Sequence, residues 1–363
     1  MKAYLIPAIG MALLTGVAPS GAAHAQAKKK PPVKKPAAAS QKPKPAPAKG
    51  GPIVLGTTQL PGDFGKLGQT YTVGKDTPIN FTLKSAEYTT ARFNADEYSS
   101  IPGKSQKLLV LHYTVHNPLP REQRYYWADL KFTAVDSKDV NHEFTQSVTR
   151  EGTTERVEVT LKPAQKLEVQ TAILVPAAGV VPKLIVSRDD GSPVVRYDLR
   201  GKVKPLPAPI ADPADPTGAT VRKAIPAEAN TYYPLGEFDV QFESAAYTTE
   251  ELRGQSAGDG NRYLTATFRI KNATNTPKRY YWATFTPELR DADGEKVEYP
   301  QTLLKATRPE VAEGGDVAPG EEVRFRFFFV LPEKVAGKTL TLTEDAGGDP
   351  PTHGYVFDVS GAK

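Results

Sequence analysis

The sequence predicts an all-β protein made of two tandem immunoglobulin-like β-sandwiches. Three observations predict it: an internal repeat, alternation of apolar and polar residues, and the lack of long segments with helical periodicity. The clearest sign of the repeat is the run Arg-Tyr-Tyr-Trp-Ala at 124–128, which recurs at 279–283, 155 positions later. A repeat at such a distance predicts two copies of one domain.

Further matches define the limits of the two copies. Leu109–Asn117 aligns with Leu264–Asn272, and Leu174–Pro176 aligns with Val330–Pro332. The segment between the copies contains six prolines, which favours a stiff linker. The expected order is domain 1 at 66–201, a Pro-rich linker at 202–227 and domain 2 at 228–363.

Alternation of apolar and polar side chains predicts half-buried strands within each copy. The pattern is clearest at 108–117 and at its counterpart 264–272. The turn signal Asp293-Gly294 and the spacing of such segments predict seven to nine strands per copy, as in an immunoglobulin-like sandwich. The residues expected to face the cores are Leu109, Leu111, Tyr113 and Val115 in the first copy and Leu264, Ala266, Phe268 and Ile270 in the second.

The N-terminus has the features of an export signal. Lys2 precedes an apolar stretch from Ala3 to Val17, and Ala23-His24-Ala25 matches a cleavage site. Residues 1–25 are therefore expected to be a signal peptide, and the mature protein to be periplasmic, envelope-associated or extracellular. No later stretch has the roughly 18 apolar residues of a membrane span, so no transmembrane segment is expected after cleavage.

A cationic spacer follows the signal. Residues 26–52 contain eight Lys, seven Pro and no acidic residue, which predicts a disordered Lys/Pro-rich spacer and lead-in over 26–65. Residues 1–50 carry nine Lys and no acid, so the rest of the chain has 37 basic and 41 acidic residues. The expected partner is an envelope polymer or protein, and the spacer is expected to contact anionic polymers or a membrane surface. Nucleic acid is not expected, because export removes the protein from it.

Composition and motif tests favour a protein without catalytic activity. The chain has no Cys, which excludes disulfides, thiol catalysis and thiolate metal sites. Gly254–Gly258 matches the G-x-S-x-G motif of serine hydrolases, and Asp291 and His353 follow in a suitable order. That motif needs a strand-to-helix turn, whereas Ser256 lies in a polar loop of an all-β pattern. A serine hydrolase centred on Ser256 is therefore a minor alternative.

The histidine spacing does not favour a metal site. His112 and His116 share the outer face of one predicted strand but would lie about 13 Å apart. A single metal ion needs ligands much closer together than this. We expect no metal site, no cofactor and no enzymatic activity.

The repeated aromatic cluster is the candidate ligand-binding site. If 124–132 forms one regular strand, Tyr125 and Trp127 face outward, and the second copy presents Tyr280 and Trp282 in the same phase. Such an exposed Tyr-x-Trp pair is suited to stack on a sugar or a peptide. The alternatives are a bulge that turns the Trp into the core, or a loop or sister domain that covers the rings.

A series of turn and strand residues carries a resemblance to a known family. In the second copy they are Lys271-Asn272, Phe285, Leu289, Asp291, Asp293-Gly294, Tyr299, Pro319-Gly320-Glu321, Phe329 and Leu331-Pro332. In the first copy they are Asn117, Asp136, Phe144, Pro163 and Val175-Pro176. This pattern resembles an immunoglobulin-like family of unknown function in bacterial secreted proteins and lipoproteins, and is similar in fold to the mycobacterial secreted immunogenic antigen. The resemblance implies an envelope or extracellular accessory domain and brings no catalytic residues.

Taken together, these patterns predict an exported, non-enzymatic cell-envelope or extracellular accessory protein. Its expected role is that of a protein- or surface-interaction module. The main alternative is a carbohydrate-binding module that uses the two Tyr-x-Trp pairs.

Overall fold

The computed structural model describes residues 63–307, 311–344 and 351–363. The expected signal peptide at 1–25 lies outside these residues, as does the expected spacer up to residue 62. The described residues form 25 β-strands and contain no α-helix, which confirms the predicted all-β class. No helix in these ranges is long and apolar enough to cross a membrane.

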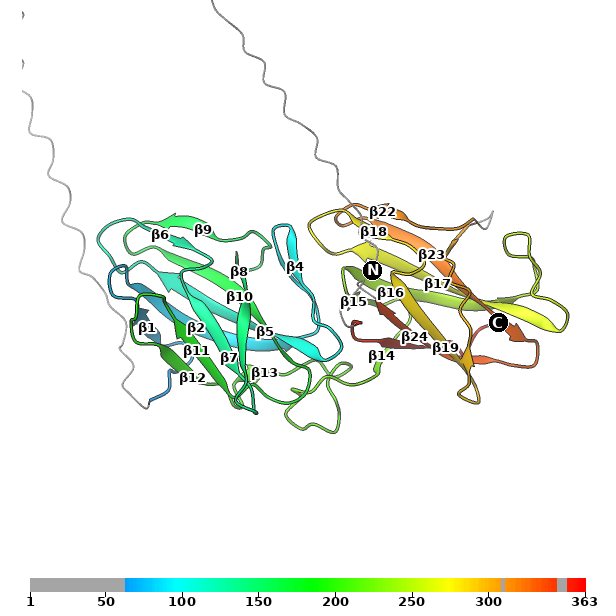
Figure 1. Ribbon diagram of the computed structural model, residues 1–363, viewed down its shortest axis with the longest axis horizontal. Helices are drawn as coiled ribbons and strands as arrows, with labels where there is room; N and C mark the ends of the chain where they lie inside the picture. Colours follow the sequence, from blue (N-terminus) through cyan, green and yellow to red (C-terminus); the bar gives the residue numbers. More distant parts are fainter. Residues whose placement is uncertain (1–62, 308–310, 345–350) are drawn as a thin grey trace, which may run out of the picture. The chain divides into compact units, whose positions relative to one another are not determined.

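Thirteen strands form a first set between residues 70 and 204 (Figure 1). They are β1 (Thr70–Val73), β2 (Ile79–Thr89), β3 (Phe93–Ala95), β4 (Tyr98–Ser100), β5 (Gln106–His116), β6 (Gln123–Tyr126), β7 (Lys131–Val135), β8 (Asn141–Arg150), β9 (Glu158–Leu161), β10 (Lys166–Pro176), β11 (Lys183–Ser187), β12 (Val195–Asp198) and β13 (Val203–Lys204). The main sheet has the order β1-β2-β5-β10-β8-β7-β11-β12, and β13 pairs with β2. Two short ladders join β3 to β4 and β6 to β9.

Strand β8 connects the two layers of this first set. Glu143, near its start, is opposite Thr133 on β7, whereas Val148, further along, is opposite Thr171 on β10. Within the ladder with β10 the register shifts between Val148 and Phe144, which is opposite Ile173, and Gln146 between them has a positive φ of 51°. A bulge of this kind bends a strand, which lets one strand take part in two packed sheets.

Aromatic side chains from both layers meet in the first core. Phe81 on β2 and Tyr113 on β5 contact Phe132 on β7, with ring centroids 6.0 and 5.0 Å apart. Tyr71 on β1 meets Tyr197 on β12 at 6.1 Å. All five rings are buried, so large apolar side chains join the layers into a β-sandwich.

Twelve strands form a second set between residues 225 and 358 (Figure 1). They are β14 (Ile225–Ala227), β15 (Tyr232–Leu235), β16 (Phe238–Thr248), β17 (Asn261–Asn272), β18 (Lys278–Tyr280), β19 (Phe285–Asp291), β20 (Lys296–Val297), β21 (Leu304–Lys305), β22 (Gly315–Val317), β23 (Glu322–Pro332), β24 (Gly337–Glu344) and β25 (Tyr355–Asp358). They make two five-stranded sheets, β14-β25-β24-β19-β20 and β15-β16-β17-β23-β21, while β18 pairs with β22.

The second core is also built from rings that cross between its sheets. Phe242 on β16 meets Phe357 on β25 at 5.3 Å between ring centroids. Phe285 on β19 lies 5.8 Å from Phe238 on β16 and 5.6 Å from Phe325 on β23. These buried contacts hold the two five-stranded sheets face to face as a β-sandwich.

The alternation in the sequence is confirmed where it was clearest. The turn between β19 and β20 also forms as predicted: Asp291 N–H donates to the Glu295 carbonyl (3.0 Å), and Gly294 has a φ of 89°. A positive φ is what favours glycine at this position. All eight residues that were predicted to face the cores are buried: Leu109, Leu111, Tyr113, Val115, Leu264, Ala266, Phe268 and Ile270.

The segment expected as a linker, 202–227, packs against the first set of strands over residues 203–221, whereas its last three residues form β14 of the second set. Val203 on β13 is opposite Ala86 on β2, and Leu206 and Val221 are buried. The side chain of Lys107 is fully buried beneath this segment and anchors it through hydrogen bonds. Burial lowers the pKa of its amine to about 8. Lys107 Nζ donates to the carbonyls of Ala177 (3.3 Å), Gly179 (2.7 Å) and Ala219.

Candidate functional site

A tight turn follows the repeated tyrosines in each set of strands. In the first set, Asp129 N–H donates to the Tyr126 carbonyl (3.1 Å) and the Asp129 carboxylate accepts the Tyr126 N–H (2.9 Å). In the second set, Thr284 N–H donates to the Tyr281 carbonyl (3.0 Å) and the Thr284 hydroxyl accepts the Tyr281 N–H (3.1 Å). We call residues 126–129 and 281–284 the aromatic turns.

These turns correct the predicted orientation of Tyr125 and Tyr280. Strand β6 ends at Tyr126 and β7 begins at Lys131, so the expected regular strand over 124–132 is wrong. Because a turn intervenes, the two-residue period of β7 cannot be continued back into β6. Tyr125 and Tyr280 are buried in the cores and do not form an exposed platform.

Both buried tyrosines have polar partners for their hydroxyl groups. Tyr125 Oη lies 3.3 Å from Tyr113 Oη, and Tyr280 Oη donates to the Glu313 carboxylate at 2.7 Å. Burial raises the pKa of both phenols, because the charged form loses its solvation. These side chains therefore anchor β6 and β18 to the cores.

The second tyrosine and the tryptophan of each repeat reach the surface, and those of the second set are the more exposed. Tyr281 and Trp282 are 49% and 44% exposed, with centroids 6.3 Å apart and ring planes at 88°. Tyr126 and Trp127 have nearly the same geometry, at 6.3 Å and 81°, although Trp127 is half-buried against the core. The repeat thus presents two perpendicular rings at each aromatic turn.

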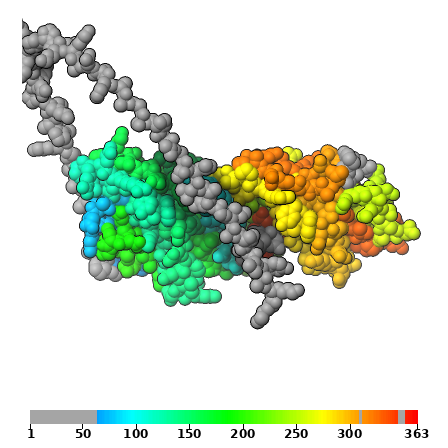
Figure 2. Space-filling view, turned by 45° about the horizontal axis from the view of Figure 1, so that its top comes forward, coloured from blue at the N-terminus to red at the C-terminus, as the bar shows by residue number. Residues whose placement is uncertain are grey.

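Tyr126 and Tyr281 are the residues that strand periodicity missed. The signal that could have found them is the polar residue three positions later, Asp129 or Thr284, because such side chains close turns by accepting a backbone N–H. Figure 2 shows the yellow to orange part of the chain, to which the second aromatic turn belongs, at the surface of the view.

Guanidinium groups cover the rings of the first aromatic turn. Arg124 Cζ lies 5.1 Å from the centroid of the Tyr126 ring, and Arg124 also pairs with Glu158. Arg156 Cζ lies 5.5 Å from the Trp127 ring and 5.0 Å from the Tyr98 ring. Cation–π attraction at these distances holds the two rings in fixed orientations.

A buried asparagine fixes the loop that leads to each aromatic turn. Asn117 and Asn272, which the sequence repeat aligns, both donate from Nδ2 to backbone carbonyls and accept a loop N–H at Oδ1. Each amide therefore ties the end of one strand to the start of the next element. The carbonyls are those of Arg121 (2.8 Å) and Leu161 (3.0 Å) for Asn117, and Thr276 and Val317 (both 2.8 Å) for Asn272.

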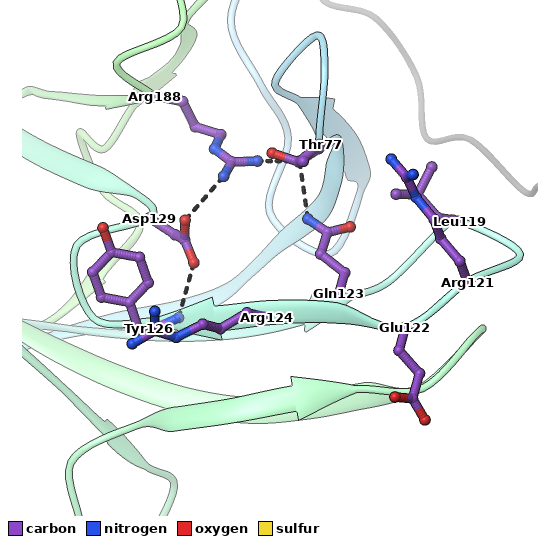
Figure 3. A pocket seen from close by; sticks show the side chains of 9 residues that line it. All are labelled: Thr77, Leu119, Arg121, Glu122, Gln123, Arg124, Tyr126, Asp129 and Arg188. Carbon is purple, nitrogen blue, oxygen red and sulfur yellow. Dashed lines mark hydrogen bonds and ion pairs between the residues drawn. The ribbon is translucent and has the colours of Figure 1, made fainter.

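A hollow of about 380 Å³, which we call the arginine hollow, lies beside Tyr126 (Figure 3). Arg188 pairs with Asp129 in its wall at 2.9 Å and donates to the Thr77 carbonyl. Gln123 Nε2 donates to the same carbonyl at 2.9 Å. Because its charge is paired with Asp129 and it also bonds the Thr77 carbonyl, Arg188 stiffens this wall. The other lining residues are Leu119, Arg121, Glu122 and Arg124.

A second hollow, of about 350 Å³, lies at the same turn and also has Tyr126 in its wall. We call it the tryptophan hollow, because Trp127 lines it. The ion pair between Lys131 and Asp189 (2.6 Å) forms part of its wall. The other lining residues are Ala128, Phe132, Thr133, Glu143, Phe144 and Gln146.

The residues of the hydrolase alternative have separate environments. Ser256 is exposed in a loop between Gly254 and Gly258, both with positive φ, and the described residues contain no helix to follow it. The Asp291 carboxylate accepts two N–H groups of its own hairpin at 3.0 and 2.8 Å, and His353 is buried. The structural context that the motif requires is therefore missing at Ser256.

The histidines of strand β5 have carboxylate and amide neighbours. His112 Nδ1 lies 3.0 Å from Glu151, and its Nε2 lies 3.5 Å from Glu87. His116 Nδ1 lies 3.0 Å from Asn80 Nδ2. Over the described part of the chain, no group of three or more His, Cys, Asp or Glu residues could hold a metal ion.

The chain was compared with protein families, curated proteins and solved structures, and only solved structures are similar to it. No protein-family model matches the chain, and no curated protein matches it. An uncharacterized β-sandwich protein from Clostridium difficile 630 is 14% identical with a TM-score of 0.28, covering 37% of this chain and 92% of its own. A proposed lipoprotein from Bacillus subtilis is 20% identical with a TM-score of 0.28, covering 36% of this chain and 39% of its own.

A secreted protein from Mycobacterium tuberculosis is also similar, at 15% identity and a TM-score of 0.27, covering 38% of this chain and 96% of its own. At such identities the likeness is one of fold alone. The β-sandwich arrangement rests on the sheets and cores described above, and membership of a particular immunoglobulin-like family stays a proposal.

Proposed function

We propose that this chain is an exported, non-enzymatic accessory protein of the cell envelope or the extracellular space, which binds a protein or a surface through its aromatic turns. The observation that carries the proposal is the second aromatic turn, where Tyr281 and Trp282 present two large rings to solvent. Tyr and Trp dominate binding energies at protein interfaces, because each buries a large rigid area with few rotatable bonds.

The N-terminal sequence supports the exported location. We propose a signal peptide at 1–25, a cationic spacer at 26–65 and two immunoglobulin-like domains at 66–201 and 228–363, joined by the segment 202–227. The spacer would contact anionic polymers or a membrane surface and so bring the aromatic turns close to their partner. The proposal includes no cofactor and no catalytic residue.

The binding role is tested by truncating the exposed rings. Sedimentation of the purified mature chain with envelope fractions should show a loss of about tenfold or more in affinity for Trp282→Ala, and a smaller loss for Tyr281→Ala. Tyr232→Ala is the matched control, since Tyr232 is an aromatic residue with 36% exposure that lies outside both the spacer and the aromatic turns. Wild-type affinity of the Trp282→Ala variant would contradict the proposal.

The exported location needs its own measurement. Cell fractionation of the full chain should place the protein outside the cytoplasm with a mature N-terminus near residue 26, as N-terminal sequencing would read. A cytoplasmic, uncleaved chain would contradict this part of the proposal.

Carbohydrate binding is the second candidate function, and the tryptophan hollow favours it. The hollow sets an indole ring beside hydroxyl, carboxylate and amide side chains, which is the mixture that a sugar ring requires.

A further inference from the structure

We infer that the tryptophan hollow binds an uncharged saccharide of one or two rings, with Trp127 as the stacking side chain and Gln146 as its main hydrogen-bonding partner. The inference rests on the proposed binding role of the aromatic turns and names the ligand class of the first one. The hollow's volume of about 350 Å³ is at the small end of the range for ligand sites, which limits the ligand to a short segment.

The hollow has both apolar and hydrogen-bonding side chains, which match the C–H face and the hydroxyl groups of a sugar ring. Trp127 and Phe144 supply apolar area, which suits the C–H face of a pyranose ring. Thr133 and Glu143 lie opposite each other on β7 and β8, so a hydroxyl and a carboxylate stand side by side on the sheet surface. The Thr133 hydroxyl and the Glu143 carboxylate can form hydrogen bonds with the hydroxyl groups of the sugar, while the apolar residues contact its C–H face.

Gln146 lines the hollow and is one of seven described non-glycine residues with a positive φ. Its φ is 51°, and it lies in the bulge of β8 between Phe144 and Val148, both of which are opposite residues of β10. Its side chain is exposed and lines the hollow, and its amide has no hydrogen-bond partner among the described residues, so it is available to a ligand. Positive φ at such a residue is costly and is common where a side chain is aimed at a ligand.

The ring of Trp127 is held in place before any ligand arrives. Arg156 lies over it at 5.5 Å, and Tyr126 meets it edge to face at 6.3 Å. A side chain that is already ordered loses little rotamer entropy on binding, so more of the contact energy becomes affinity.

The charges in the hollow select against acidic sugars. Lys131 and Asp189 neutralise each other at 2.6 Å, which leaves the Glu143 carboxylate as additional negative charge in the wall. A uronic acid would place a second carboxylate in this space, whereas a neutral or N-acetylated sugar would donate hydrogen bonds from its hydroxyl or amide groups to Glu143.

The test uses the fact that the chain has two tryptophans. In a Trp282→Phe background the emission of Trp127 alone reports on the hollow. We expect a saturable change with cellobiose, maltose or N,N′-diacetylchitobiose, and binding weaker by about tenfold for digalacturonate. Glu143→Gln should reduce that discrimination against the anionic sugar.

The role of Gln146 is separated from a purely structural one by two substitutions. Gln146→Gly keeps the positive φ without strain, so Gln146→Gly and Gln146→Ala should both lose about tenfold in affinity while their melting temperatures differ. The matched control is Gln301→Ala, since Gln301 is an exposed glutamine with a φ of 53° in the second set of strands, and it should bind as the background protein does.

The results that would refute sugar binding in the hollow differ from those that would refute the proposed binding to the envelope. No saturable change with any of the uncharged sugars, tighter binding of digalacturonate, or full affinity in Gln146→Gly would each refute it. If envelope binding is still lost in Trp282→Ala, such a result would leave the proposed interaction function in place.

Discussion

Asp129 and Arg188 form an ion pair at 2.9 Å beneath the first aromatic turn, and their side chains are only 12% and 10% exposed. The same Asp129 carboxylate accepts the N–H of Tyr126 at 2.9 Å. One side chain therefore closes the turn and neutralises a cation that is almost shielded from water.

Removal of this carboxylate should be costly. Asp129→Ala leaves Arg188 without its charge partner and should lower the free energy of unfolding by about 3–5 kcal/mol, as urea denaturation would measure. Asp129→Asn keeps a turn-closing oxygen and should cost less. At the equivalent position in the second set, Thr284→Ala removes a neutral hydrogen bond only and should cost about 1 kcal/mol. Equal losses in Asp129→Ala and Thr284→Ala would contradict the importance of the ion pair.

The buried amides of Asn117 and Asn272 should contribute similar amounts to the free energy of unfolding. Each donates to at least two carbonyls and accepts one N–H, so Asn→Ala at either position should cost about 2–3 kcal/mol in unfolding free energy. Asn→Asp keeps the acceptor but loses the donors and should also destabilise. A cost near zero at one position and a large one at the other would show that the two loops are held differently.

The Lys107 amine should control how the segment 202–227 is held. Lys107→Met leaves the carbonyls of Ala177, Gly179 and Ala219 without this donor, and we expect a loss of about 2–4 kcal/mol. Limited proteolysis should then cut near residues 205–219 earlier than in the wild type. Lys183→Met is the control, because the pair of Lys183 with Asp139 is exposed and should contribute less than about 1 kcal/mol. Unchanged proteolysis would contradict this role.

Glu344 should make stability depend on pH. Burial raises the pKa of this carboxyl from 4.5 to about 8, although Glu237 N–H donates to it at 3.0 Å. Because the folded state holds the proton more tightly than the unfolded one, its contribution to stability falls as pH rises from about 4.5 to about 8. Glu344→Gln should therefore stabilise the protein more at pH 9 than at pH 4.5, as parallel urea titrations would measure. The same gain at both values would contradict the raised pKa.

Gly236 provides an independent check on the space around Glu344. It has a φ of 55°, and a Cβ built on it would lie 0.9 Å from Glu344 Oε2. Gly236→Ala should therefore cost about 2 kcal/mol or more, from both backbone strain and the clash. Gly294→Ala has a similar φ constraint with open space around it and should cost less.

The two tryptophans should differ in their exposure to quenchers. In Trp127→Phe the remaining Trp282 should emit at long wavelength and be quenched readily by acrylamide, since it is 44% exposed. In Trp282→Phe the remaining Trp127 should emit at shorter wavelength, because it is half-buried against the core. Equal quenching in the two variants would contradict the difference between the aromatic turns.

The alternation of apolar and polar residues predicted the fold class correctly, but it predicted the wrong orientation for Tyr125 and Tyr280. Residues such as Leu109 and Phe268 are buried as predicted, because a two-residue period reports directly on the two faces of a regular strand. The same rule assigned Tyr125 and Tyr280 to the surface and was wrong there. A turn closed by Asp129 or Thr284 interrupts the strand, and a one-residue change of phase reverses every side chain before it.

The all-β class, the internal repeat and the export-like N-terminus can be read from the chain before it folds, because they depend on periodicity, self-similarity and composition. Three features emerge only in the folded structure: which rings are exposed, the contact of Lys107 with the segment 202–227, and the hollow that Trp127 and Gln146 share. These features depend on groups far apart in the chain, brought together by a bulge in β8 and by burial of one sheet against another. No local pattern encodes where such contacts form.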